Sequence, residues 1–420
     1  MTEALTPPRG FASTTVWKWQ LAPARALVTL NYGRALRADK RVRGTVPVFG
    51  TNGQCGWHDA ALARGPGVIL GRKGQGPLGV EWCETDFWVI DTAYFVSDLA
   101  PDIDLKYFFY LVKYVGLNHL KDGTSNPTLS RDSFGAQLLP VPPLSEQRSI
   151  GSVLQVLDDK IELNRRMNAT LESVARTLFQ SWFVDFDPVR AKMDGREPVG
   201  MDAETAALFP DSFGDSQLGP SPTGWESRSL DEIADFLNGL ALQKYPPSER
   251  ETLPVIKIAQ LRKGDSSGAN RCSRDIAESY LVRDGDVLFS WSGSLEIELW
   301  CGGEGALNQH LFKVTSTEFP KWFYYLWTLE HLDEFRRIAA DKATTMGHIQ
   351  RGHLTAAQVL VSPRRLLDRM TLLMSPLVDK LIANRIQART FATLRDTMLP
   401  KLLSGELRAS KVDRIPESVA

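Results

Sequence analysis

The sequence lacks the features of a membrane or exported protein. It contains no run of about 18 apolar residues, so it predicts no membrane-spanning helix. The first residues, MTEALTPPRGFASTTVWKW, do not combine a basic segment with an apolar stretch, so they predict no secretory signal. The four cysteines lie far apart without a CxxC pair, which favours buried free thiols in a reducing cytoplasm over a metal site or disulfides. These cysteines are Cys55, Cys83, Cys272 and Cys301.

The sequence also lacks the motifs of common catalytic sites. Its six histidines form no HExxH pair, and it contains no GxSxG element, no Walker loop and no NPP-aromatic element of adenine methyltransferases. GQGPLG (74–79) fits a dinucleotide-binding loop by its letters, but a strand-like segment follows where such a site requires a helix. PDIDLK (101–106) fits a nuclease motif by its letters, but we interpret Asp104 as a helix N-cap. The sequence therefore predicts a binding or scaffolding protein and not an enzyme.

The chain has little net charge, −1 at pH 7, which is unusual for a nucleic-acid-binding protein. The charge is distributed unevenly, however. Residues 1–143 contain 15 Lys/Arg and 12 Asp/Glu (net +3), residues 181–235 contain 4 and 12 (net −8), and residues 364–420 contain 11 and 6 (net +5). Because the acidity is concentrated in one middle segment, basic surfaces elsewhere are compatible with contact to phosphates.

A length of 420 residues exceeds one ordinary hydrophobic core, so we expect two or more domains. Two charged, helix-like segments, LDDKIELNRRMNATL (157–171) and LVDKLIANRIQARTF (377–391), share Leu, Asp, Lys, Asn, Arg and Thr at an offset of 220 residues. Upstream, GVILGRKG (67–74) aligns with DVLFSWSG (286–293) at an offset of 219. This pattern predicts an internal repeat in which a globular unit followed by a helix occurs twice.

Each globular unit contains short β-type runs between turn residues, together with aromatic-rich helical segments such as DLKYFFYLVKYVG. The predicted fold class is therefore α+β, with two pseudo-repeated mixed α/β domains and two long helices. A helix of about 35 residues at ~1.5 Å per residue is roughly 50 Å long. Such a pair of helices would hold two units at a spacing of about one to one and a half turns of B-DNA.

Both long helices show apolar residues at spacings of three and four, as in a coiled-coil seam. Matching stripes allow two such helices to bury each other. Asn164 and Asn384 interrupt the stripes at matched positions, where a buried Asn would fix the register; alternatively, both face solvent. The predicted seam consists of Ile150, Val153, Leu157, Ile161, Asn164, Leu171, Val174 and Leu178 in the first helix, and Met370, Leu373, Leu377, Leu381, Asn384, Phe391, Leu394 and Met398 in the second.

Loops of both units contain side chains suited to DNA. Arg and Lys match guanine edges and phosphates, and Asn and Gln match adenine edges. Each of these residues taken alone is equally compatible with an ordinary solvated surface, and the prediction depends on their recurrence in both units. The candidates are Arg34, Arg37, Lys40, Arg41, Arg43, Thr51, Asn52, Arg72 and Lys73 in the first unit, and Lys244, Lys257, Gln260, Arg262, Lys263, Trp291, Ser292, Asn308, Gln309 and His310 in the second.

Long ordered blocks of the sequence resemble the specificity (S) subunits of type I restriction–modification systems. The segment PLSEQRSIGSVLQVLDDKIELNRRMNATLESVARTLFQSWF (143–183) is similar to their helical region. VPVFGTNG, GVILGRKGQG and FWVIDTAYFV resemble one class of target-recognition domain, and LPVIKIAQLRKG, GDVLFSWSGSL and GALNQHLFKV resemble another. The resemblance implies target-recognition domain 1 (1–143), a first spacer helix (144–183), an acidic linker (184–221), target-recognition domain 2 (222–363), a second spacer helix (364–408) and a C-terminal tail (409–420).

The resemblance also implies a function. Each target-recognition domain would recognise one half of a bipartite, asymmetric site in double-stranded DNA, and the helices would form an antiparallel coiled coil that sets the gap. Two methyltransferase subunits, and two restriction subunits where present, would dock on this non-catalytic chain. S-adenosylmethionine, ATP and Mg²⁺ would bind to those partners and not to this chain. The acidic linker would face a methyltransferase subunit or solvent, since its charge repels DNA.

Three other functions stay open at the level of the sequence. The chain could belong to a related system that only methylates, or it could be a double-headed adaptor that binds proteins. It could also be a self-contained enzyme, which would require a catalytic motif that the sequence does not contain.

Overall fold

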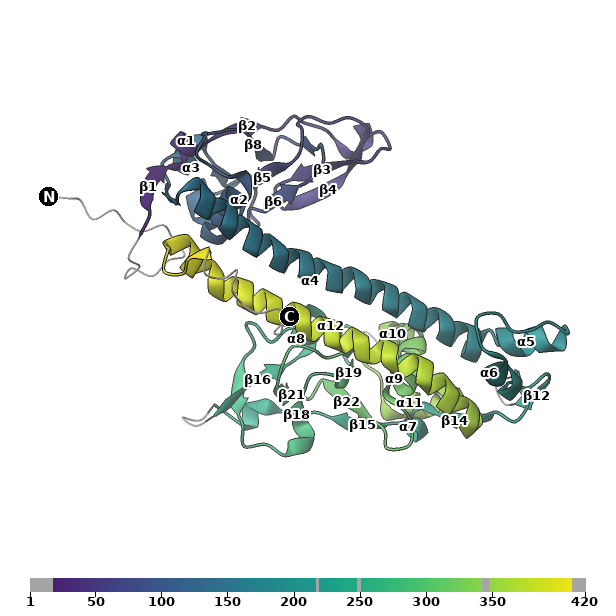
Figure 1. Cartoon of the computed structure of the whole chain (residues 1–420). Coiled ribbons are helices and arrows are strands. Elements are labelled where there is room, and N and C mark those ends of the chain that lie inside the picture. Colours follow the sequence, from purple (N-terminus) through teal and green to yellow (C-terminus); the bar gives the residue numbers. More distant parts are fainter. Residues whose placement is uncertain (1–17, 217–218, 248–250, 342–346, 410–420) are drawn as a thin grey trace. The chain divides into compact units, whose positions relative to one another are not determined.

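The computed structural model describes residues 18–216, 219–247, 251–341 and 347–409 (Figure 1). The predicted C-terminal tail after residue 409 and the start of the first predicted domain lie outside the described residues. The chain divides into two compact units: unit 1 comprises Met1–Lys160 and Phe391–Ala420, and unit 2 comprises Ile161–Thr390. Within the described ranges, no helix is long and apolar enough to cross a membrane.

Unit 1 consists mainly of short strands and short helices, and it ends in a long helix whose second part belongs to unit 2. In chain order the elements are β1 (Gln20–Pro23), α1 (Ala24–Leu27), β2 (Val28–Tyr32), η1 (Ala38–Lys40), β3 (Val46–Gly50), β4 (Gly53–His58), β5 (Gly67–Gly71), β6 (Val80–Cys83), β7 (Trp88–Val89), β8 (Ala93–Leu99), α2 (Leu105–Val115), η2 (Asn118–Leu120), β9 (Lys121–Asp122), β10 (Thr128–Leu129), α3 (Arg131–Gly135), β11 (Leu138–Val141) and α4 (Leu144–Phe179).

Unit 2 begins within α4 and ends within the second long helix. Its further elements are a π-helical turn η3 (Gln180–Val184), α5 (Asp187–Met193), α6 (Ala203–Leu208), β12 (Phe213–Ser216), β13 (Gly219–Pro222), β14 (Glu226–Ser229), α7 (Leu230–Ile233), β15 (Asp235–Asn238), η4 (Leu242–Lys244), β16 (Thr252–Ile256), α8 (Ile258–Lys263), β17 (Arg271–Ser273), η5 (Glu278–Tyr280), β18 (Leu281–Val282), β19 (Val287–Ser290), β20 (Ile297–Leu299), β21 (Gly305–Leu307), β22 (Leu311–Thr315), α9 (Lys321–Glu330), α10 (Leu332–Asp341), α11 (Arg351–Ala356), β23 (Gln358–Val361) and α12 (Arg364–Ser404).

The two units share one strand topology. The main antiparallel sheet has the order β2-β8-β5-β6 in unit 1 and β15-β22-β19-β20 in unit 2. A second sheet contains one parallel pair in each unit, β3 with β7 and β16 with β21. The first strand pairs with the strand before the long helix, β1 with β11 and β14 with β23. The internal repeat predicted from the sequence is therefore confirmed as a repeat of topology.

A buried aromatic helix packs on the main sheet of each unit. In unit 1, α2 buries every side chain from Tyr107 to Val112. The carboxylate of Asp104 accepts a hydrogen bond from the Tyr107 backbone amide at 2.9 Å, which confirms the predicted N-cap. In unit 2, Trp322 and Phe323 of α9 are fully buried and contact Phe183. The strand ends that carry the candidate residues are thus fixed by a rigid core.

Within unit 2, α4 and α12 run antiparallel. Asn164 Nδ2 donates to Gln387 Oε1 at 2.9 Å, and four residues later along α4, Asn168 Oδ1 accepts from Asn384 Nδ2 at 2.9 Å. Asn168 Nδ2 also donates to the Leu381 carbonyl at 3.2 Å. Both predicted asparagines are buried, so the alternative in which they face solvent is wrong. Their hydrogen bonds fix which residues of the two helices lie opposite each other.

In unit 1, a charged contact takes the place of the amide pair. Arg395 Nη1 of α12 donates to Asp158 Oδ1 of α4 at 2.5 Å, and the Tyr110 hydroxyl donates to the other oxygen of Asp158 at 2.9 Å. The hydroxyl of Tyr110 stays protonated, because burial and the Asp158 carboxylate raise its pKa. Unit 1 therefore fastens the same two helices with an ion pair.

The predicted seam is wrong at Val174, Leu373 and Leu394, whose side chains are exposed. Strict spacing of three and four places Ala175, Met374 and Arg395 at these turns, and the structure gives them the inward positions. Hydrophobicity favoured the larger apolar member of each adjacent pair, whereas helix geometry selects the neighbour, even when it is small or charged. Leu154, absent from the prediction, is fully buried.

The segment predicted as an acidic linker is largely folded. It forms α5, α6 and the hairpin β12–β13. Val189 and Phe209 are buried in the core of unit 2, which a plain linker would not provide. Arg369 of α12 forms ion pairs with Asp202 at 3.1 Å and Glu204 at 3.0 Å. Part of the negative charge in this region is therefore paired with an arginine of the same chain.

Candidate nucleic-acid interface

A basic loop follows the main-sheet strand β2 of unit 1. The cationic side chains of Arg34, Arg37, Lys40 and Arg43 are exposed. Arg37 Nε donates to Asp39 Oδ1 at 3.2 Å. Arg41 differs, since its Nη1 donates to the Cys55 carbonyl at 2.5 Å and anchors the loop on β4. We define residues 34–43 as the basic loop. Its exposed cations are suited to phosphate contacts.

An arginine–tyrosine stack lies at the adjoining strand ends. The guanidinium groups of Arg72 and Arg131 lie 4.8 Å and 4.0 Å from the ring centre of Tyr32, and the ring is half exposed. Arg72 also donates to the Asp91 carbonyl at 2.8 Å. Burial and the neighbouring Tyr32 hydroxyl raise the pKa of Tyr94, so this tyrosine is neutral. The stack is a flat cationic surface on which a base can lie.

The turn at residues 72–73, which contains two of the candidate residues, is only partly exposed. Arg72 is half-buried, and Lys73 is half-buried beside Asp91, with Nζ to Oδ2 at 3.0 Å. The Thr51 hydroxyl donates to the Lys73 carbonyl at 2.8 Å and therefore supports the turn, whereas Asn52 is exposed. Strand β5, which precedes the turn, is an inner strand of the main sheet. The first residues after it are therefore still partly buried.

Unit 2 presents a cluster of aromatic and polar side chains. The Trp291 indole Nε1 donates to Asn238 Oδ1 at 2.9 Å, and the indole ring lies 5.9 Å from His310 and 6.3 Å from His348 between ring centres. Gln309 lies beside His310, with Nε2 3.3 Å from His310 Nε2. Amide, imidazole and indole groups together can form hydrogen bonds and stacking contacts with bases.

Two predicted contact residues of unit 2 are buried and support the others instead. Asn308 Oδ1 accepts a hydrogen bond from the His310 backbone amide at 3.3 Å. The Ser292 hydroxyl lies 3.0 Å from His310 Nδ1. A buried side chain cannot contact a base directly, so these residues set the position of His310.

The predicted basic cluster of α8 lies elsewhere in unit 2. Arg262 and Lys263 line a cavity of about 560 Å³ that is also lined by residues of α4 and α12. Lys257 Nζ donates to Asn270 Oδ1 at 2.8 Å, and Gln260 Oε1 accepts from the Lys257 backbone amide at 3.3 Å. Lys244 is exposed on η4. The sequence cluster is therefore divided between a structural role and a surface beside the long helices.

Strand register places the two candidate surfaces at equivalent points. Leu70 pairs with Tyr94 in unit 1, and Phe289 pairs with Phe312 in unit 2, so Arg72 and Trp291 each follow two residues later. The next residue forms a bridge in each unit, Lys73 with Thr128 and Ser292 with His348. We call these surfaces the unit 1 edge and the unit 2 edge. They share a position in the fold and differ in chemistry.

Sequence reasoning missed several residues of both edges. Tyr32, Arg131, Asn238 and His348 contribute to the stack and the cluster, and Trp57 on β4 is half exposed beside the basic loop's anchor. A signal was available for Arg131, because it aligns with Arg351 at the repeat offset of 220. Arg351 in turn donates to the Phe236 carbonyl at 3.1 Å. Cys55 is exposed, against the expectation that all four thiols are buried, and all four are free.

Comparison with known proteins shows what the chain is similar to. Residues 80–173 match the model of the type I restriction modification DNA specificity domain. The MjaIX specificity subunit of Methanocaldococcus jannaschii is 26% identical over 320 residues, which cover 73% of this chain and 70% of that protein. In these regions the chain is similar to a specificity subunit of a type I restriction enzyme. The HindI specificity subunit of Haemophilus influenzae is a further relative, 22% identical over 380 residues, with 77% of this chain and 82% of that protein covered.

A solved specificity subunit shows the same fold. The crystal structure of the type I S subunit from M. genitalium has a TM-score of 0.61 and 16% sequence identity, and the match covers 94% of this chain and 98% of that one. The region matched by the specificity-domain model contains β8, α2, α3 and most of α4. It therefore includes Asp91 and Arg131 of the unit 1 edge.

Proposed function

We propose that this chain is the sequence-specific DNA-binding subunit of a type I restriction–modification complex, with no catalytic activity of its own. Unit 1 recognises one half of a bipartite, asymmetric site in double-stranded DNA, and unit 2 recognises the other half. The observation that supports this most is the placement of two chemically different edges at one equivalent point of a repeated fold. Different side chains on the same strand ends allow the two half-sites to differ in sequence.

The long helices act as the spacer in this proposal. Helix α4 has 36 residues, which corresponds to about 54 Å at ~1.5 Å per residue. The hydrogen-bonded asparagines of unit 2 and the Asp158–Arg395 pair of unit 1 hold α4 and α12 in one antiparallel register, as a coiled coil requires. The gap between the half-sites is then set by helix length.

The helices also offer a surface for partner subunits. Leu163 and Val174 are exposed on one side of α4, eleven residues or about three turns apart, and Leu372 and Leu373 are exposed on α12. Exposed large apolar groups on a helix favour docking of a partner helix. We assign this surface to two methyltransferase subunits, which bind S-adenosylmethionine and flip the target adenine out of the duplex. Restriction subunits, which use ATP and Mg²⁺, join where the system has them.

The test is DNA binding by the chain assembled with its methyltransferase partners. We expect the affinity to fall steeply with salt and to exceed the affinity for random duplex by at least about 10³-fold at one preferred site. An adaptor for proteins would show neither property. Turnover by the purified chain alone would instead indicate an enzyme and would contradict the proposal.

A further inference from the structure

In each unit, one basic residue outside the main sheet holds the loop that contributes to the edge of that unit. In unit 2 the loop connects β19 to β20 (residues 291–296), and it begins with Trp291 and Ser292. In unit 1 the equivalent loop connects β5 to β6 (residues 72–79) and begins with Arg72 and Lys73. We call these two segments the edge loops.

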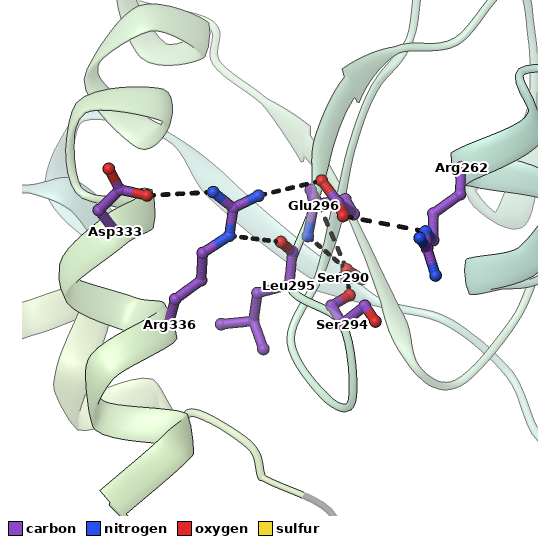
Figure 2. A network of polar contacts seen from close by, with 7 residues as sticks. All are labelled: Arg262, Ser290, Ser294, Leu295, Glu296, Asp333 and Arg336. Atoms are coloured by element: carbon purple, nitrogen blue, oxygen red, sulfur yellow. Dashed lines mark hydrogen bonds and ion pairs between the residues drawn. The ribbon is translucent and has the colours of Figure 1, made fainter. Parts of the chain in front are cut away.

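Arg336 of α10 holds the edge loop of unit 2 through two nitrogens of its guanidinium group, and the third nitrogen contacts its own helix. Its Nε donates to the Leu295 carbonyl at 3.1 Å, and its Nη2 donates to Glu296 Oε2 at 3.1 Å. Its Nη1 donates to Asp333 Oδ1 at 3.0 Å, one turn earlier on the same helix. Figure 2 shows the guanidinium group between these two carboxylates, directed at the loop. A planar fork of donors in this arrangement restricts the loop more than a single contact would.

The rest of the edge loop depends on this anchor. The Ser290 hydroxyl donates to the Ser294 carbonyl at 2.6 Å and accepts from the Glu296 backbone amide at 2.8 Å, which closes the loop on itself. Leu295 is buried in the core of unit 2. Glu296 also lies 4.0 Å from the Arg262 guanidinium, on the side opposite to Arg336 (Figure 2). The end of the loop distal to Trp291 is therefore fixed, and this limits where Trp291 and Ser292 can lie.

Lys121 has the same task in unit 1, with different chemistry. Its ammonium group donates to the carbonyl oxygens of Gly74 at 3.1 Å, Gln75 at 3.4 Å and Gly76 at 2.9 Å. Gln75 Nε2 adds hydrogen bonds to the carbonyls of Thr124 and Ser125, at 3.0 Å and 2.8 Å. Three backbone carbonyls around one cation hold the middle of this glycine-rich loop, and the hydrogen bond from the Gly74 amide to the Pro127 carbonyl adds to them.

We propose that Lys121 and Arg336 are positioning residues that determine base selectivity, each for its own half-site, without contacting DNA. Their N–H donors already bind loop carbonyls and carboxylates, so we expect them to hold the loops and not to bind phosphates directly. Loss of either residue would not change which side chains form the edge. Those side chains could then adopt several positions. This inference rests on the proposed function, since it concerns how the same edges discriminate between bases.

The experiment uses the chain assembled with its methyltransferase subunits. A duplex selected from a random-sequence pool gives the preferred site, and two further duplexes have one or the other half-site scrambled. Affinities for the three duplexes are measured at several salt concentrations for the wild type and for Arg336→Met, Arg336→Lys and Lys121→Met. Arg337→Ala is the matched control, because it removes the same charge from the adjacent position of α10.

We expect Arg336→Met to reduce discrimination at one half-site about tenfold and Lys121→Met to do so at the other, with the salt slope unchanged. Arg336→Lys keeps the charge without the fork, so it should fold normally and lose part of the discrimination. Thermal melting of each variant identifies any loss of folding. If Arg336→Met does not fold, the discrimination measured for Arg336→Lys tests the inference.

Three results would contradict the inference. A salt slope lower by about one, with equal weakening on all duplexes, would show that Arg336 or Lys121 contacts phosphate directly. Unchanged discrimination in the variants would show that the edge loops need no anchor. A wild-type complex that does not distinguish the three duplexes would overturn the proposed function, and this inference with it.

Discussion

The edges of the two units occupy the same place in one repeated topology, yet they have opposite character. Unit 1 combines the exposed cations of the basic loop with the Arg72–Tyr32–Arg131 stack. Unit 2 combines Trp291 with two histidines and amide groups, and no Lys or Arg belongs to this cluster. The difference shows that the strand order sets where each edge lies, while the side chains after β5 and β19 set its chemistry.

The long helices contrast with the edges, because they bury apolar side chains at matched positions in both units. We expect Leu154→Asp in unit 1 and Met374→Asp in unit 2 to destabilise the chain equally, by about 4 kcal/mol or more, since both side chains are fully buried. Thermal or denaturant unfolding measures the loss.

Val174→Asp and Leu373→Asp are the controls for this prediction. Their side chains are exposed, so the unfolding free energy of the isolated chain should change by less than about 0.5 kcal/mol. Assembly with methyltransferase subunits should nevertheless weaken. A large loss of stability in these controls would show that Val174 and Leu373 lie in the seam, as the sequence predicted.

The charge contrast between the edges predicts different salt dependences. Replacing Arg34, Arg37, Lys40 and Arg43 together by Gln should lower the magnitude of the slope of log affinity against log salt by about 3.6, because each of four phosphate contacts contributes about 0.9. The double substitution Gln309→Ala, His310→Ala in unit 2 should leave the slope unchanged and reduce discrimination about tenfold. Equal slopes for the two variants would contradict the proposed difference in phosphate contacts between the two edges.

The seam itself differs between the units, with an amide pair in unit 2 and an ion pair in unit 1. Asn384→Leu should destabilise unit 2 by about 1–2 kcal/mol, because Asn168 Oδ1 then lies buried without its donor. The double variant Asn168→Leu, Asn384→Leu should recover most of this loss. A double-mutant cycle measures the coupling, and strict additivity of the two substitutions would contradict the pair.

The smallest expected effect concerns a feature that only unit 2 has, the folded segment around α6. Hydrogen bonds from the Thr205 backbone and hydroxyl, together with Arg369, lower the pKa of Asp202 from 3.8 to about 2. Because the folded-state pKa is depressed, the contribution of Asp202 to stability is present above pH 3.8 and is lost as the pH falls towards 2. Hydrogen exchange in α6 should therefore accelerate over this range, and Asp202→Asn should abolish that pH dependence.

The sequence predicted the repeat, the α+β class and the asparagines of the seam, because these depend on spacing along the chain. It misplaced the seam at Val174, Leu373 and Leu394, where an exposed apolar residue adjoins a small or charged inward one. The acidic segment looked like a linker because the apolar residues that bury it, Val189 and Phe209, are isolated in the sequence.

The edges were predictable only in part, for a similar reason. Trp291, Gln309 and His310 were found because they stand in conspicuous loops, whereas Tyr32 and Asn238 are single residues at strand ends. Only the pairing of β2 with β8 and of β15 with β22 brings those residues to the edges. Burial of Ser292 and Asn308, and the use of Lys121 and Arg336 by loop carbonyls, depend on contacts between distant segments that no local pattern records.

The central claim, that each unit recognises its own half of one DNA site, is tested most directly by mapping methylated adenines in cells. The cells would contain the methyltransferase subunits with the wild-type chain, with Trp291→Ala, or with Tyr32→Ala. The account predicts that Trp291→Ala relaxes the sequence requirement in one half of the methylated site and Tyr32→Ala relaxes it in the other, with the gap unchanged. Relaxation of the same half by both variants, or of neither half, would contradict it.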